Sequence, residues 1–424
     1  MELMPVERRA ATVTEIFPLR RGHELRFNLP GIPHNLLNKS MLSRRVVSGR
    51  RHFCDHLAST HAVRVAPSHG LKSQCRALSA TSPAGRQPRT IFSGIQPTGV
   101  PHLGNYLGAL RQWVKIQSNA EADDKLIYSL VDLHAITIRQ DPTQLRQWKR
   151  ESLAMLLAIG LDPKRSIIFH QSDVPAHAEL MWILSCQASM GYLGRMTQWK
   201  DKTASSKEGN SEKLGLFSYP VLQAADVLVH QTTHVPVGHD QAQHLEFARQ
   251  IANGFNENYG KKVLQPPETI ISPAKRVMSL TEPGKKMSKS HPNPKSRILL
   301  TDSNEAIRSK IKSAVTDSFD GISYEPERRP GVSNLLDIYF HSGEAIEVED
   351  QVALAGHLEG HTLKALKEEV AMGVIDVVSP IRERYEELVQ NKNALDTAAS
   401  DGAEKARRSA DKTLEKVKRA VGLS

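Results

Sequence analysis

The chain has 424 residues, enough for two or three packed units at roughly 100–200 residues per domain. No window approaches the ~18 uninterrupted apolar residues of a membrane-spanning helix, so we expect no association with a membrane. A net charge of +10 would suit a nucleic-acid binder, but the charge is unevenly distributed. Residues 1–88 hold 14 Lys and Arg against 5 Asp and Glu, which leaves 42 against 41 in the remainder.

The N-terminal segment, residues 1–85, is rich in Arg, His and Ser, poor in acids, and lacks sustained periodicity. This composition is typical of an organelle transit peptide, and the apolar run of a secretory signal is missing. A basic tail that binds RNA is the alternative. We predict processing near residues 75–82 and exclude residues 1–85 from the fold. Cys54 and Cys75 lie in this segment, so only Cys186 remains, which we expect to be a small buried side chain.

From Thr90 onward, strand-like and helix-like patterns alternate. The patterns predict strands over 90–96, 125–136 and 165–172, and helices over 104–117, 143–160 and 176–186. This alternation predicts an α/β fold with a doubly wound parallel sheet, Rossmann-like in its architecture. Ligands bind such sheets at the carboxyl ends of the strands. We therefore expect the polar corners at 96–105, 132–135 and 170–177 to lie on that edge.

The second half of the chain changes character. Residues 201–215 are polar and read as a mobile loop, and a helical run follows from Ser218. From Asn304 the patterns are mostly helical. We predict a Rossmann-like catalytic domain over 86–303 and an all-α domain over 304–424.

Two polar segments indicate chemistry. In QPTGVPHLGN (96–105), Gly99 and Gly104 allow a phosphate to approach the backbone, and a helix N-terminus near Gly104 offers unpaired N–H groups. His102 and Asn105 are one helical turn apart and can face the same ligand. In PGKKMSKS (283–290), two lysines on a loop can fold over a polyphosphate. A turn with a surface histidine and a solvated basic loop are the respective alternatives.

Together these segments resemble the HIGH and KMSKS signatures of the class I aminoacyl-tRNA synthetases. The finer motifs, GIQPTGxxHLGNYLGAL, VDLHAIT, MTQxKxK, YPxLxAAD, VPVGxDQxQH and KMSKSxPNP, resemble the tryptophanyl-tRNA synthetases over roughly residues 90–420. The resemblance implies that the chain activates L-tryptophan with ATP, releases pyrophosphate, and transfers the tryptophan to tRNA(Trp). It also implies a homodimer whose helical domain binds the anticodon. With the N-terminal segment, the resemblance is to an organellar form, located in the mitochondrial matrix.

The resemblance assigns site residues by position. Catalysis by positioning and charge stabilisation would fall to His102, Asn105, Lys286, Ser288 and Lys289. The implied contacts to ATP are Gln96, Pro97, Thr98, His102, Gly104, Asn105, Lys200, Lys202, Gly238, His239, Asp240, Val277, Lys286, Met287, Ser288, Lys289 and Ser290. We expect Mg²⁺ on the phosphates, with few protein ligands, and no protein metal site.

The amino acid would be selected by one face of a helix, since Tyr219, Gln223 and Asp226 stand at i, i+4 and i+7. An indole offers only an N–H donor, and Asp226, among apolar neighbours, is the simplest acceptor. An Asp at a helix surface is the alternative reading. The resemblance implies that Gln241 and Tyr219 meet the α-amino and carboxylate groups.

Two positions depart from the family pattern. His239 stands where an acid is usual, and Gln223 where Met is usual. Gln223 would also suit a phenol, so a tyrosyl-tRNA synthetase stays an alternative. A nucleotidyltransferase of the same fold and a non-catalytic RNA-binding relative are the others. His134 suits a pocket wall or the core equally, and we expect His170 and His177 to be structural.

Overall fold

The computed structural model describes residues 86–200, 213–238, 241–260, 262–271, 277–342 and 348–424. These residues belong to one compact unit, Ala80–Ser424. The predicted transit segment, most of the predicted loop 201–215, and the predicted site residues Lys202, His239 and Asp240 lie outside the described residues. Within the described part of the chain, no helix is long and apolar enough to cross a membrane.

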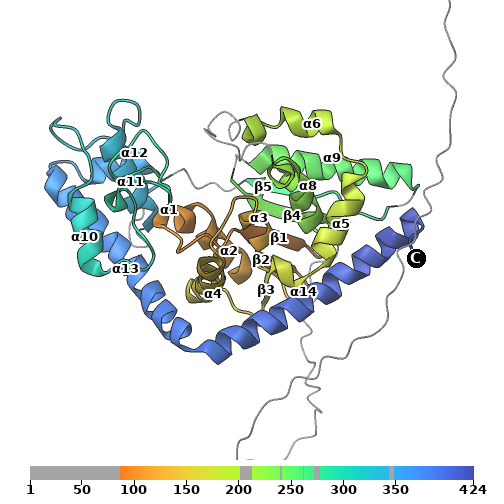
Figure 1. Cartoon of the computed structure of the whole chain (residues 1–424). Helices are drawn as coiled ribbons and strands as arrows, with labels where there is room; N and C mark the ends of the chain where they lie inside the picture. The colour runs from red at the N-terminus through yellow and green to blue at the C-terminus, as the bar shows by residue number, and fades with distance from the viewer. Residues whose placement is uncertain (1–85, 201–212, 239–240, 261, 272–276, 343–347) are drawn as a thin grey trace, which may run out of the picture. The chain divides into compact units, whose positions relative to one another are not determined.

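A five-stranded parallel sheet forms the centre of this unit (Figure 1). Its strands are β1 (Thr90–Ile95), β2 (Lys125–Leu130), β3 (Ser166–His170), β4 (His234–Val237) and β5 (Glu268–Ile271). The strand order is β3-β2-β1-β4-β5. Because the order reverses between β1 and β4, a crevice for a ligand is expected between their carboxyl ends. The predicted doubly wound parallel sheet is confirmed.

Helices cover the sheet between and after its strands. They are α1 (Leu103–Asn105), the π-helix η1 (Tyr106–Leu110), α2 (Arg111–Ser118), α3 (Asp132–Ala135), α4 (Pro142–Ala158), the 3-10 helix η2 (Gln171–Asp173), α5 (Ala176–Ser185), α6 (Met190–Arg195), α8 (Leu214–Leu228) and α9 (Ala242–Asn258). Local chemistry explains their ends. The Asp141 side chain accepts a hydrogen bond from the Gln144 backbone N–H at 2.8 Å, Pro142 occupies the first turn of α4, and Gly160 (φ 107°) follows its end.

Both faces of the sheet are buried, because helices cover each of them. Neighbouring residues of a strand point to opposite faces and so join different cores. On β1, Ile91 packs with the core under α2 and α4, whereas Phe92 packs with the core under α5, α8 and α9. The first core continues into the C-terminal helices. A strand that must be apolar on both faces has few positions left for polar groups, so these gather at the strand ends.

One predicted strand is too long. We expected a strand over 125–136, but β2 ends at Leu130 and α3 begins at Asp132. The neighbouring strands explain this, because Ile95 of β1 and His170 of β3 both pair with Leu130 and both end their strands there. Residues beyond Leu130 have no ladder to join. The expectation of a buried Cys186 is also wrong, since this residue is exposed directly after α5.

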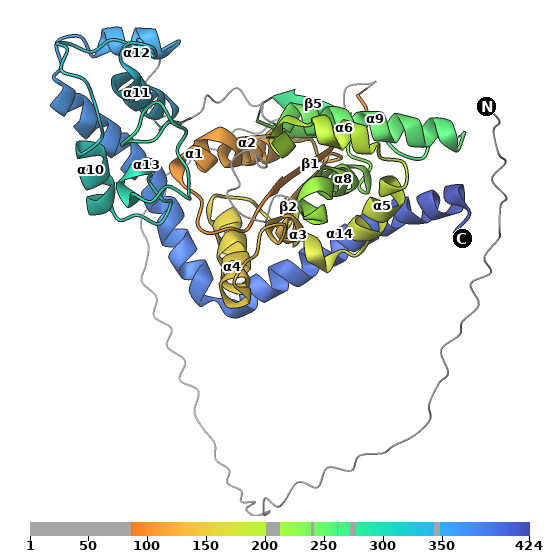
Figure 2. The ribbon, with the colours of Figure 1, turned by 45° about the horizontal axis from the view of Figure 1, so that its top comes forward.

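The C-terminal part is helical, as predicted. It contains the 3-10 helix η4 (Pro294–Ser296), α10 (Asn304–Lys312), α11 (Pro330–Ser342), α12 (Gln351–His357), α13 (Leu363–Gln390) and α14 (Lys392–Val421). The last two are the longest helices described, and they are drawn in blue in Figures 1 and 2. α10 and α11 pack with α13, and α12 packs with α11, while α14 returns along the sheet.

Helix α14 covers the open edge of β3 (Figure 1). The approach is close, because a Cβ at Gly402 would overlap the carbonyl oxygen of Ile168 in β3. Cationic side chains also tie α14 to the α/β part. Lys405 Nζ donates to the Pro163 carbonyl at 3.0 Å, and Arg407 Nε donates to the Asp173 carbonyl at 2.7 Å. An edge strand is thus shielded by the C-terminal helix.

Candidate active site

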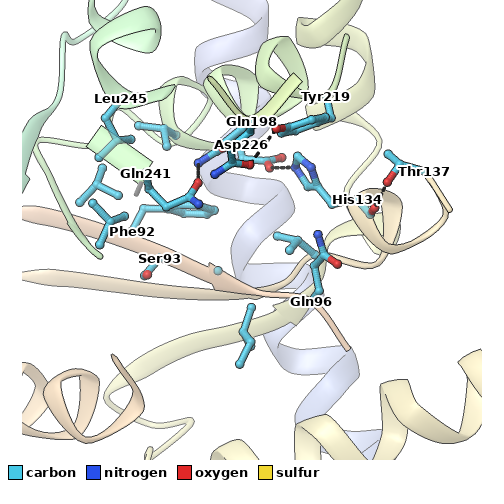
Figure 3. A pocket seen from close by; sticks show the side chains of 17 residues that line it. Phe92, Ser93, Gln96, His134, Thr137, Gln198, Tyr219, Asp226, Gln241 and Leu245 are labelled. Carbon is cyan, nitrogen blue, oxygen red and sulfur yellow. Dashed lines mark hydrogen bonds and ion pairs between the residues drawn. The ribbon is translucent and has the colours of Figure 1, made fainter. Parts of the chain in front are cut away.

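A cavity of about 320 Å³ opens at the carboxyl ends of β1 and β4, where the strand order reverses (Figure 3). Its walls come from β1 and the residue after it, from α3, from α8 and from the start of α9. The polar residues in these walls are Ser93, Gln96, His134, Thr137, Gln198, Tyr219, Gln223, Asp226 and Gln241. All four residues predicted to read the amino acid therefore face one cavity, together with Gln96 from the predicted ATP corner.

Asp226 is the charged residue of this wall, and its side chain is 2% exposed. Its Oδ1 accepts from Gln171 Nε2 at 2.6 Å and lies 2.7 Å from His177 Nδ1. Its Oδ2 lies 2.8 Å from His134 Nε2 (Figure 3). Burial alone would raise the pKa of Asp226, but the hydrogen bonds from His134 and His177 hold it well below the ordinary value. Asp226 is therefore an ionised acceptor whose neighbours in sequence are apolar.

The other three predicted readers are joined by hydrogen bonds. Tyr219 Oη donates to Gln198 Oε1 at 2.9 Å, and Gln223 Nε2 donates to Gln241 Oε1 at 3.3 Å. Burial raises the pKa of Tyr219 to about 12, so its hydroxyl stays protonated at neutral pH. The predicted i, i+4, i+7 face of α8 is confirmed as a wall of the cavity.

Several residues of this network escaped the sequence analysis. Gln171, Gln198 and His244 were not singled out, and His177 was expected to be merely structural. His244 Nε2 lies 3.4 Å from Tyr219 Oη, and its Nδ1 lies 3.1 Å from Gln241 Oε1. Gln198 and His244 stand inside the family-like motifs MTQxKxK and VPVGxDQxQH, and Gln171 and His177 lie in the predicted polar corner 170–177. Their hydrogen-bond partners could not be predicted, because these lie on other elements of the fold.

The corner after β1 is organised by its own side chains. His102 Nδ1 accepts from the Asn105 backbone N–H at 3.2 Å, and Asn105 Oδ1 accepts from the His102 backbone N–H at 3.1 Å. This reciprocal cap starts the helix. Burial, with the charges of Lys289, Lys286 and Arg297, lowers the pKa of His102 to about 3, so the ring is neutral. A Cβ at Gly104 would lie 3.1 Å from the His102 ring, which explains the glycine.

The KMSKS segment folds onto this corner. Lys289 Nζ donates to the Gly99 carbonyl at 2.8 Å, and burial lowers the pKa of Lys289 to about 8. Lys286 is exposed, and Met287 is buried with its backbone N–H donated to the Val277 carbonyl at 3.1 Å. Two segments about 180 residues apart in sequence thus bring a neutral histidine and two lysines to one place.

The other predicted ATP contacts differ in their surroundings. Thr98 donates its backbone N–H to the Gln96 carbonyl at 2.9 Å, Pro97 is buried, and Val277 packs against Gly104. Ser288 Oγ lies 3.0 Å from Ser290 Oγ. Gly238, after β4, and Lys200, after α6, are both exposed. No group of three side chains able to hold a metal ion occurs in the described ranges.

A model of the class I tRNA synthetases for tryptophan and tyrosine (W and Y) matches residues 85–376. This match covers well over half of the chain and includes both signature segments. The chain therefore belongs to the class I aminoacyl-tRNA synthetases.

Individual relatives narrow this further. The mitochondrial tryptophan–tRNA ligase of Schizosaccharomyces pombe is 44% identical over 348 residues, covering 79% of this chain and 95% of the relative. That of Saccharomyces cerevisiae is 42% identical, covering 79% and 91%. A crystal structure of tryptophanyl-tRNA synthetase from Campylobacter jejuni, complexed with ADP and tryptophan, covers 79% of this chain and all of its own, at 33% identity and a TM-score of 0.66.

Within its class, the chain is thus a member of the tryptophan–tRNA ligases, and its location is mitochondrial. This agrees with the transit-peptide composition of residues 1–85. Membership favours tryptophan over the tyrosyl, nucleotidyltransferase and non-catalytic alternatives that the sequence analysis left open.

Proposed function

We propose that the cavity beside α8 binds the tryptophan side chain and that Asp226 accepts its indole N–H. The observation that carries this is the incomplete set of donors on a buried carboxylate. A carboxylate has about four acceptor positions, and three protein donors occupy two on Oδ1 and one on Oδ2. The remaining position on Oδ2 suits a single N–H donor, which is what an indole offers.

ATP would bind between the His102 corner and the KMSKS segment, as its Mg²⁺ complex. Lys286 and Lys289 are cations, so they suit phosphate oxygens, and the ion would keep water ligands. The tryptophan carboxylate would attack the α-phosphorus in line and release pyrophosphate. Ser288 and Asn105 would help to orient the triphosphate. Catalysis would rest on positioning and charge stabilisation, with no protein nucleophile.

The same proposal extends to the polymer substrate and to assembly. The helical part, residues 304–424, would bind the tRNA anticodon, while a ribose hydroxyl at the tRNA end attacks the adenylate.

The chain would act as a homodimer. Exposed apolar side chains support an interface near α5 and α6, where Trp182 is 70% and Met190 68% exposed. Light scattering of the Trp182→Glu variant tests this, and an unchanged dimer would place the interface elsewhere.

The test of the amino-acid site is exchange of pyrophosphate into ATP, with tryptophan and tyrosine in parallel. Losing a hydrogen bond to a charged group costs about 1.5–3 kcal/mol, so Asp226→Asn should raise the tryptophan KM about 10- to 100-fold. The KM of ATP should change little. Asp132→Asn is the matched control, because Asp132 is also a buried carboxylate near the sheet edge but pairs with Lys149 outside this cavity.

An Asp226→Asn variant with the wild-type tryptophan KM would refute the assignment of the indole acceptor. Exchange driven by tyrosine in the wild-type protein would instead show that Gln223 and its neighbours read a phenol.

A further inference from the structure

Behind Asp226, a chain of hydrogen-bonded side chains crosses the interior to helix α14. His177 Nδ1 lies 2.7 Å from Asp226 Oδ1, and His177 Nε2 lies 3.3 Å from His230 Nε2. His230 Nδ1 lies 3.0 Å from Ser409 Oγ on α14, and Ser409 Oγ also accepts from Lys125 Nζ at the start of β2. His177 and His230 are 0% and 2% exposed, so solvent does not supply alternative partners.

The chemistry of these groups gives this series of hydrogen bonds one donor-to-acceptor direction. An ammonium group can only donate, so Lys125 leaves the Ser409 hydroxyl proton available for His230 Nδ1. A neutral His230 then carries its proton on Nε2 and donates to His177 Nε2. His177 in turn carries its proton on Nδ1 and donates to the carboxylate. Every donor points toward Asp226, and every imidazole nitrogen in the chain has a partner.

Packing holds the two rings in place. The His230 ring stacks on Phe92 of β1 with centroids 5.8 Å apart and meets Phe169 of β3 edge-on at 5.8 Å. The His177 ring lies 5.6 Å from Phe169. Burial lowers the pKa of His230, and the nearby Lys125 ammonium lowers it further, which keeps this ring neutral. His230 therefore packs against aromatic side chains of both β1 and β3, and His177 packs against that of β3.

We propose that His177, His230 and Ser409 are positioning residues that orient the Asp226 carboxylate for the tryptophan side chain, so that helix α14 of the C-terminal part contributes to amino-acid selection. This inference rests on the proposed role of Asp226 as the indole acceptor. His134, which lines the cavity, lies 2.8 Å from Oδ2, whereas Gln171 and His177 both hold Oδ1, and His177 connects that oxygen to α14. A carboxylate held at both oxygens keeps its remaining acceptor position, on Oδ2, aimed into the cavity.

The variant that isolates this effect is Ser409→Ala, because it removes one hydroxyl from a helix without placing a larger group in the core. Ser409→Thr restores the hydroxyl. Ser400→Ala is the matched control, since Ser400 is an exposed serine of the same helix. All three full-length variants are compared with the wild-type protein by pyrophosphate exchange, with the KM of tryptophan, the KM of ATP and kcat measured separately.

We expect Ser409→Ala to raise the tryptophan KM about 3- to 10-fold, the effect of one hydrogen bond, with the ATP KM and kcat within about twofold. Ser409→Thr and Ser400→Ala should match the wild-type protein. In an Asp226→Asn background, Ser409→Ala should have no further effect on the tryptophan KM, because the carboxylate that the chain orients is gone.

Three results would overturn the inference. Ser409→Ala and Ser400→Ala could have the same tryptophan KM while Asp226→Asn still raises it. The proposed function would then stand, but the hydrogen-bonded path from Ser409 to Asp226 would have no part in it. Ser409→Ala could change both KM values and kcat together, which indicates a general structural role. If Asp226→Asn itself has the wild-type tryptophan KM, the proposed role of Asp226 fails and this inference fails with it.

Discussion

Replacing Arg329 by Met should strongly destabilise the C-terminal part. The Arg329 side chain is 3% exposed at the start of α11. Its guanidinium donates to both oxygens of Asp317, and to the carbonyls of Phe319 and Gly321 and the hydroxyl of Ser323, at 2.8–3.2 Å. One side chain thus ties together the irregular segment between α10 and α11.

The magnitude follows from what the substitution leaves behind. Removing one partner of a buried ion pair costs about 3–5 kcal/mol, because the other charge stays without compensation. The Asp317 side chain is 19% exposed, and this partial hydration places the loss near the lower value, about 3 kcal/mol. Thermal unfolding should shift down by about 5 °C or more.

Arg328→Met provides the control. The neighbouring Arg328 is 66% exposed and meets Glu325 at 3.5 Å, a surface pair worth about 0–1 kcal/mol. Both variants are unfolded by heat and by urea under identical conditions. If Arg329→Met lies within about 1 kcal/mol of Arg328→Met, the reasoning from buried hydrogen bonds is wrong.

Three further outcomes are expected. Because the Lys289 pKa is about 8, its positive charge is lost as pH rises through that value. The ATP KM should therefore rise above about pH 8 in the wild-type protein and stay flat in Lys289→Arg, whose charge persists. Equal pH profiles of the ATP KM in the two proteins would contradict the role of Lys289 in binding phosphate. The folded-state pKa of Asp226 is depressed, so its stabilising effect is present above about pH 4 and fades as pH falls further. The difference in unfolding free energy between the wild-type protein and Asp226→Asn, measured in urea, should therefore narrow below about pH 4. A difference that stays constant with pH would count against an ionised Asp226. Gly402→Ala should lower the free energy of unfolding by about 1–3 kcal/mol, because the added methyl group pushes α14 away from Ile168. Gly254→Ala, which has open space around it, should be neutral or stabilising. Equal melting temperatures of the two variants would show that α14 can move away from β3 at little cost in free energy.

The sequence patterns predicted the sheet, its parallel connections and the face of α8 correctly, because periodicity reports directly on which residues share a side. Asp226 could be singled out because a charged residue among apolar sequence neighbours needs a partner. The patterns could not end β2 at Leu130, because that end depends on where β1 and β3 stop. Strand termination is a property of the ladder rather than of the strand.

The polar partners of the site were equally hidden. His177 and His230 meet only because α5 and the end of α8 pack on the same side of the sheet, and Ser409 reaches them from α14. His102 and Asn105 were predicted to face a common ligand from their spacing, and the structure shows in addition that each caps the backbone of the other. Reciprocal capping needs backbone dihedral angles that spacing does not supply.

The covering of β3 by α14 has a consequence for the order of events during import. Arg407 and its partner Asp173 are 234 residues apart in sequence, so when the N-terminus enters an organelle first, the sheet edge arrives long before the helix that shields it. An uncovered strand edge can pair with another chain. Until α14 follows, the edge of β3 is open to such pairing.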